Sequence, residues 1–88
     1  MQELKLQKFG ANNQRLSNIS NPLKATCYPD KEVFFEIGHH YGFNKKYLEI
    51  CTSHYNSATT GKMLFFETIQ EAKDWLEQNY NLKVVEVA

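Results

Sequence analysis

A single amphipathic helix, predicted over residues 68 to 80, is the feature that most constrains the fold of this chain. Thr68 and Glu71 form a capping box, in which the threonine hydroxyl accepts a hydrogen bond from the backbone N–H of Glu71 and the glutamate reaches back to Thr68. Asn81 tolerates the left-handed conformation that ends helices. The apolar side chains between these ends recur three and four positions apart, which gives the helix one face to bury: Ile69, Ala72, Trp75, Leu76 and Tyr80.

The rest of the chain alternates apolar and polar residues over short segments, as half-buried strands do. Strands are predicted within residues 2–8, 23–27, 33–37, 48–52, 62–67 and 84–87, and a long loop over 11–22, where many side chains bond to nearby backbone. The predicted fold class is α+β, with the element order β-β-β-β-β-α-β. We expect one domain over residues 1–88: an antiparallel sheet of five to six strands, its first and last strands at the edges, and the helix packed on one face.

The hairpin around Gly42 is the strand pairing that the sequence defines best. Pairing about this turn sets Ile37 opposite Leu48 and Phe35 opposite Ile50. The hydrophobic pattern and the glycine turn therefore favour the same register.

Glu36 and Glu49 face each other in this register. If the next strand pairs Ile50 with Phe66, then Glu67 extends the pair to a row of three carboxylates. Such a row can bind a divalent cation, supply an acid or base, or meet a basic partner. Like charges placed directly opposite are unfavourable, so an ordinary solvated face is the alternative.

The predicted hairpin tip concentrates aromatic, histidine and lysine side chains where the chain should be exposed. Such side chains suit stacking on bases with nearby charge for phosphate, and they equally suit the anchors of a protein interface. The alternative is that the aromatic rings fold back onto the sheet and the lysines only aid solubility. The candidate binding residues are His39, His40, Tyr41, Phe43, Lys45, Lys46 and Tyr47.

The cysteines and histidines do not form a complete metal or catalytic motif. Cys51 and His54 have the spacing of half a zinc site, but residues three apart in a strand point to opposite faces, and no second short-spaced pair is present. Cys27 and Cys51 are expected to be reduced and partly buried. The sequence therefore predicts no catalytic residue, metal or cofactor, with a metal-dependent enzyme built on the glutamate row as an alternative.

The charge and hydropathy of the sequence indicate where the protein is located and which kinds of partner it binds. The net charge is zero, residues 1–31 carry an excess of three positive charges, and Arg15 is the sole arginine. Few arginines weaken a reading based on bidentate phosphate or base recognition. Because neither a signal peptide nor a membrane span is evident, a cytoplasmic location without membrane contact is expected.

The segment from Phe66 to Leu76 resembles the strand-to-helix junction of the small arm-type DNA-binding domains of phage and transposon integrases, in which a three-stranded sheet precedes such a helix. The likeness covers about a dozen residues. The chain departs from that family in its neutral charge, its single arginine and its extra flanking strands. The resemblance implies nucleic-acid binding.

The sequence predicts a non-catalytic protein-binding module, such as a small accessory or inhibitor protein of a phage or mobile element. It would bind another protein through the 39–47 tip and the acidic sheet face. The alternative is a nucleic-acid-binding domain that uses the lysines and tyrosines of the tip together with the basic N-terminal third. A homodimer through an edge strand also stays open, with 84–87 as the candidate edge.

Overall fold

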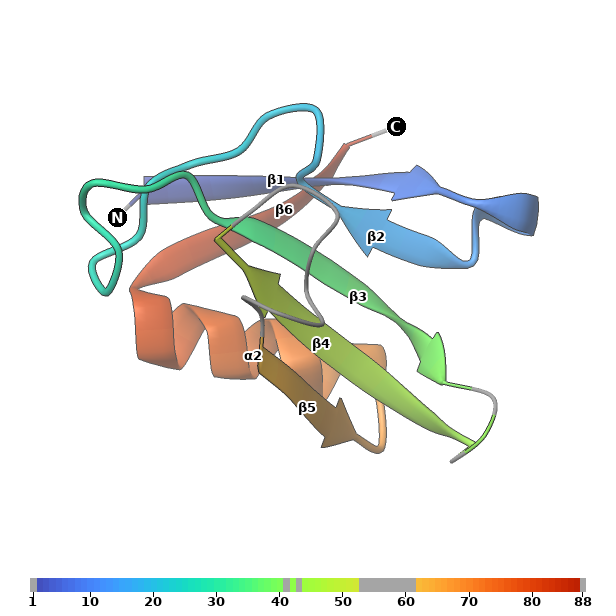
Figure 1. Ribbon diagram of the computed structural model, residues 1–88. Helices are drawn as coiled ribbons and strands as arrows, with labels where there is room; N and C mark the ends of the chain where they lie inside the picture. The colour runs from blue at the N-terminus through green and yellow to red at the C-terminus, as the bar shows by residue number, and fades with distance from the viewer. Residues whose placement is uncertain (1, 41, 43, 53–61, 88) are drawn as a thin grey trace.

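The computed structural model describes residues 2–40, 42, 44–52 and 62–87, and within them the chain forms one six-stranded sheet and two helices (Figure 1). The predicted α+β class is confirmed. In chain order the elements are β1 (Gln2–Phe9), the 3-10 helix η1 (Ala11–Asn13), β2 (Arg15–Ser17), β3 (Phe34–His40), β4 (Lys45–Cys51), β5 (Lys62–Phe66), α2 (Ile69–Tyr80) and β6 (Leu82–Val87).

Helix α2 begins and ends where its capping residues predict. The hydroxyl of Thr68 accepts from the N–H of Glu71 at 3.2 Å, and the Glu71 carboxylate accepts from the N–H of Glu67, one residue earlier than expected. Asn81 ends the helix at φ 53° and ψ 47°. Within the described residues, neither helix is long and apolar enough to cross a membrane. The side chains that α2 buries against the sheet are Ala72, Leu76 and Tyr80.

The sheet is mixed, and the expectation of a purely antiparallel sheet is wrong at one pair. The strand order is β5-β4-β3-β2-β1-β6, and β1 runs parallel to β6. Every other neighbouring pair is antiparallel, so β1 points the same way as β5. Because α2 carries the chain back across one face of the sheet, β6 also runs in the direction of β5 (Figure 1). The last strand is at an edge as expected, whereas β1 lies inside the sheet.

Strand β2 connects the β1–β6 pair to strands β3, β4 and β5. It lies inside the segment 11–22, which was predicted to be a loop. It pairs with β1 on one side and with β3 on the other. Only two of its residues, Leu16 and Ser17, pair with β3. The predicted strand at 23–27 is wrong, because β2 occupies the place beside β3; only Leu23 bridges to Val33 there.

The side chain of Asn18 extends the short contact between β2 and β3. It is 0% exposed, its Oδ1 accepts from the N–H of Phe35 at 2.6 Å, and its Nδ2 donates to the carbonyl of Val33 at 3.1 Å. The backbone N–H of Asn18 donates to the carbonyl of Phe35 at 3.2 Å. One amide side chain thus satisfies backbone groups that the three-residue strand cannot reach.

Helix α2 also contacts the outer edge of β6. The carboxylate of Glu77 accepts from the backbone N–H of Val84 at 3.0 Å, and Lys73 binds Glu86 at 2.5 Å. An edge strand normally presents such N–H groups to another chain. Here at least one of them is already occupied by the protein's own helix.

We expect Asn18→Ala to lower the free energy of unfolding by about 2–4 kcal/mol, since the backbone groups of Val33 and Phe35 lose partners in a buried place. Urea denaturation measures the change. Asn21→Ala, in the exposed loop that follows, is the matched control and should stay within about 0.5 kcal/mol of the wild type. Equal losses in the two variants would contradict the role of the Asn18 amide.

Candidate functional site

The sheet has one face covered by α2 and, within the described residues, one face without a helix. Phe35, Ile37 and Leu48 point to α2 and form the core with Leu76. Side chains alternate along a strand, so their neighbours point the other way. We call the helix-free side the open face; its residues that matter below are Phe9, Arg15, Glu36, Tyr47, Glu49, Met63 and Phe65.

The open face carries two of the three predicted carboxylates opposite each other. The predicted register of β3 and β4 is confirmed, and Glu36 faces Glu49. The predicted pairing of Ile50 with Phe66 is wrong, because Ile50 pairs with Lys62 and Glu49 with Met63. Met63 thus takes the position expected for a third carboxylate.

The observed register of β5 against β4 differs from the predicted one by four residues, and the reason is physical. A slip by an even number keeps every side chain on its face, so alternation alone cannot distinguish the two registers. The observed register places Leu64 opposite Leu48, which is fully buried. Glu67 lies beyond the end of β5, with an exposed side chain 3.7 Å from Lys45. The row of three carboxylates is therefore not assembled.

Tyr47 is the centre of a polar cluster on the open face. Its ring lies over Gly38 on the neighbouring strand, where an added Cβ would come within 2.8 Å of the Tyr47 hydroxyl oxygen. The Tyr47 hydroxyl donates to the carboxylate of Glu36, and the guanidinium of Arg15 lies 3.5 Å from the same carboxylate oxygen. The ring is only 6% exposed. Glycine is needed at position 38 because a side chain there would displace the tyrosine.

The two facing glutamates differ in their partners. Glu36 is bonded to Tyr47 and paired with Arg15. Glu49 is half-buried and has no hydrogen bond or ion pair with any residue in the described part of the chain. The charge of Glu36 is therefore offset within the protein, whereas that of Glu49 is not.

The surroundings of Tyr47 also fix its protonation. Burial of the ring, and then the hydrogen bond to Glu36, raise the pKa of Tyr47 well above its usual value. Burial raises the pKa of Tyr80, in the core, to about 12. Both phenols are therefore neutral at physiological pH.

The structure separates the predicted tip residues onto two faces. His39 pairs with Lys46 and His40 pairs with Lys45, so each pair lies on its own side of the hairpin. His40 and Lys45 belong to the open face, where the ring of His40 meets that of Phe65 edge to face at 5.8 Å. Tyr47 lies farther along β4 and is buried. Two further tip residues, Tyr41 and Phe43, are outside the described residues.

A first hollow opens on the open face beside Glu49. Its volume is about 400 Å³. We call it the Glu49 hollow; it is lined by Arg15, His39, His40, Gly42, Tyr47, Glu49 and Met63.

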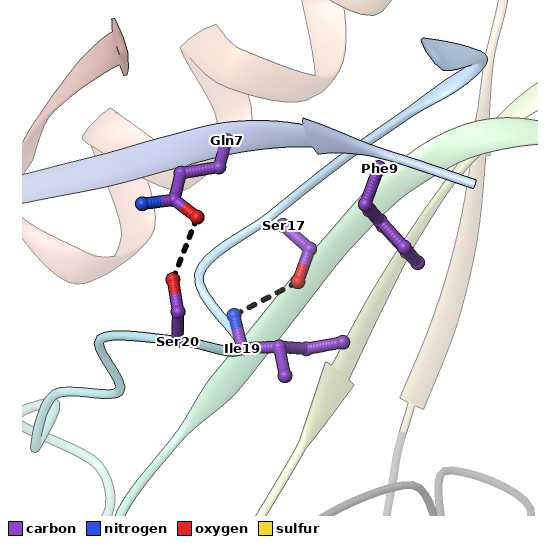
Figure 2. Close-up of a pocket in the computed structure, with 5 residues that line it drawn as sticks. All are labelled: Gln7, Phe9, Ser17, Ile19 and Ser20. Carbon is purple, nitrogen blue, oxygen red and sulfur yellow. Dashed lines mark hydrogen bonds between the residues drawn. The ribbon is translucent and has the colours of Figure 1, made fainter. Parts of the chain in front are cut away.

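A second hollow, of about 200 Å³, lies over β1 and β2 (Figure 2). The Ser20 hydroxyl donates to the Gln7 side chain at 2.7 Å, and the N–H of Ile19 donates to the Ser17 hydroxyl at 2.9 Å. Figure 2 shows Phe9 and Ile19 on either side of Ser17. Apart from these bonded groups, the hollow offers a ligand the Phe9 ring and the Ile19 side chain; we call it the Phe9 hollow.

Arg15 lies between the two hollows. Its guanidinium is 5.9 Å from the centroid of the Phe9 ring and also pairs with Glu36. The sequence marked Arg15 only as a lone arginine, and it did not single out Phe9, Met63 or Phe65. Once the strand pairing is known, the alternation of side chains along each strand places these residues on one face.

The described residues offer no group of three or more histidine, cysteine or acidic side chains that could hold a metal ion. Cys51 is buried, and Cys27 is exposed rather than partly buried as expected; these two cysteines are not joined by a disulfide bond. His54, the other half of the Cys51 spacing, lies outside the described residues.

Comparison with protein-family models, curated proteins and solved structures gives no match to this chain. The resemblance to arm-type DNA-binding domains therefore stays a prediction. The function has to be argued from the open face itself.

We expect Glu49→Gln to raise the free energy of unfolding by about 0.2–1 kcal/mol, because it removes a like charge directly opposite Glu36. Glu36→Gln should lower it by about 1 kcal/mol, because it weakens the bonds to Tyr47 and Arg15. Thermal and urea denaturation of the two variants measure both changes. Changes of the same sign would contradict the unequal roles of the glutamates.

We expect the folded state to lose stability as the pH rises above about 10, the pKa of tyrosine in an unfolded chain. Because the folded-state pKa of Tyr47 is raised, its contribution is complete below that pH, and the unfolded chain ionises first above it. Tyr47→Phe should lose less stability than the wild type between about pH 8 and about pH 11, measured as urea midpoints. Lysines titrate alike in both proteins, so equal losses would contradict the assignment.

Proposed function

We propose that this chain is a non-catalytic protein-binding module and that the open face is its binding surface. One observation carries the proposal. Among the described residues, the exposed large apolar side chains are Met63 and Phe65, each 41% exposed, and both lie on the open face of β5. Exposed apolar side chains that adjoin one another, with polar groups beside them, are typical of interaction sites.

The chemistry around these two side chains supports a protein partner. Arg15, whose side chain is 51% exposed, lies on the same face two strands away from β4. Methionine, arginine and aromatic residues are the types enriched at protein interfaces. His40 and Lys45 form a polar border beside Phe65, so the open-face half of the hairpin tip belongs to the same surface.

Nucleic-acid binding is the second candidate, and the charges of the open face favour it less. Phosphate binding needs cations that are not already neutralised. Arg15 is paired with Glu36, and Lys45 is paired with Glu67. Tyr47 is buried, so its ring cannot stack on a base in this arrangement. Binding of oligonucleotides that weakens steeply with salt would favour this candidate over a protein partner.

The proposal is tested by capturing proteins from a lysate of the source cells. The bait is the whole chain as wild type, as Met63→Ser/Phe65→Ser, or as the control Gln70→Ser/Gln78→Ser, which changes two exposed positions of α2. We expect a partner that the wild type and the control retain and the open-face variant loses. Circular dichroism melting verifies that all three proteins are folded. The same captured proteins on all three baits would contradict the proposal.

A further inference from the structure

We propose that the open face binds an extended segment of its partner that carries an apolar side chain and, about four residues along, an arginine or lysine. The apolar side chain would occupy the Phe9 hollow and the basic one the Glu49 hollow. This inference rests on the proposed protein-binding function and names the chemistry of the partner.

The basic side chain is argued from the charges in the Glu49 hollow. Glu36 already has Arg15 and the hydroxyl of Tyr47 as partners. Glu49 faces Glu36 across one strand spacing and has no such partner in the described part of the chain. A cation in the hollow would offset the charge of Glu49 and the repulsion between the two carboxylates.

The walls of the Glu49 hollow suit a long basic side chain. Met63, which is 41% exposed, offers apolar surface directly opposite Glu49 on the neighbouring strand. Arginine and lysine pack their methylene stems on apolar surface while the charged head meets a polar group. A volume of about 400 Å³ leaves room for such a side chain.

The apolar side chain is argued from the Phe9 hollow. Phe9 and Ile19 provide apolar walls, while the Ser20 hydroxyl, the Gln7 side-chain oxygen and the Ser17 hydroxyl oxygen take part in the two bonds drawn in Figure 2. A polar ligand group would have to compete with the bond that already joins Ser20 to the Gln7 oxygen, whereas an apolar group can pack on Phe9 and Ile19. An aliphatic side chain is therefore the better occupant.

The spacing follows from the sheet. Gln7, Ser17, Glu36 and Glu49 follow one another in a single row across β1, β2, β3 and β4. Neighbouring strands are about 4.8 Å apart, so the row is about 14 Å long, and four residues of an extended chain cover about 13 Å. Side chains four residues apart in an extended segment point to the same side, which lets both enter the face at once.

The test uses short synthetic peptides that carry a leucine and an arginine four residues apart among serines and threonines. Amide chemical shifts of the isotope-labelled protein report where each peptide binds and how tightly. In one comparison peptide citrulline, which has the shape of arginine without its charge, replaces the arginine. In another, the two side chains are three residues apart and so point to opposite sides.

We expect the arginine peptide to shift the amides around both hollows and to bind about tenfold more tightly than the citrulline peptide. Glu49→Gln should remove that difference, whereas Glu3→Gln, on the same face of β1 but outside both hollows, should preserve it. The peptide with the shorter spacing should bind more weakly than the first.

Equal binding of arginine and citrulline peptides, equal effects of the two glutamine variants, or no binding of the first peptide would overturn the inference. These results are distinct from failure of the proposed function. If capture of the lysate partner still requires Met63 and Phe65, the proposed protein-binding function is supported and only the chemistry assigned to the partner is wrong. If capture does not depend on these residues, the proposed function itself fails.

Discussion

Strand β2 connects strands β1 and β6 to strands β3, β4 and β5, and the side chain of Asn18 strengthens this connection. The geometry of the open face depends on it. β2 has three residues, and two of them pair with β3. Asn18 adds two buried side-chain bonds to the backbone of β3 and the residue before it. The Phe9 hollow lies on the β1 side of this junction and the Glu49 hollow on the β4 side. The distance between the two hollows is therefore set by the contact between β2 and β3.

Local signals made much of this fold predictable. The helix has a capping residue, Thr68, at one end and a left-handed asparagine, Asn81, at the other, and each acts within a few residues of itself. The hairpin register was predictable because the turn at Gly42 and the alternation of both strands agree. The same alternation assigns side chains to the correct faces, and this is why the facing position of Glu36 and Glu49 was predictable.

The features that could not be predicted depend on distant parts of the chain. No local pattern shows that the amide of Asn18 replaces strand pairing, or that β2 excludes residues 23–27 from the place beside β3. The position of β5 differs from the prediction by an even slip, which leaves the hydrophobic pattern unchanged. Tyr47 was expected at an exposed tip, and its burial depends on Gly38 in another strand. The candidate site is therefore less predictable than the fold.

The carboxylate that Glu77 places on the edge of β6 has a consequence for how copies of this chain can assemble. A filament built by strand pairing needs two usable edges on every molecule, so that each copy is both a donor and an acceptor. A strand added to β6 would have to displace Glu77 from the N–H of Val84. Within the described residues this leaves β5 as the edge for such pairing. A molecule with a single usable edge could form at most a closed pair of two copies by strand pairing, and not a growing fibre.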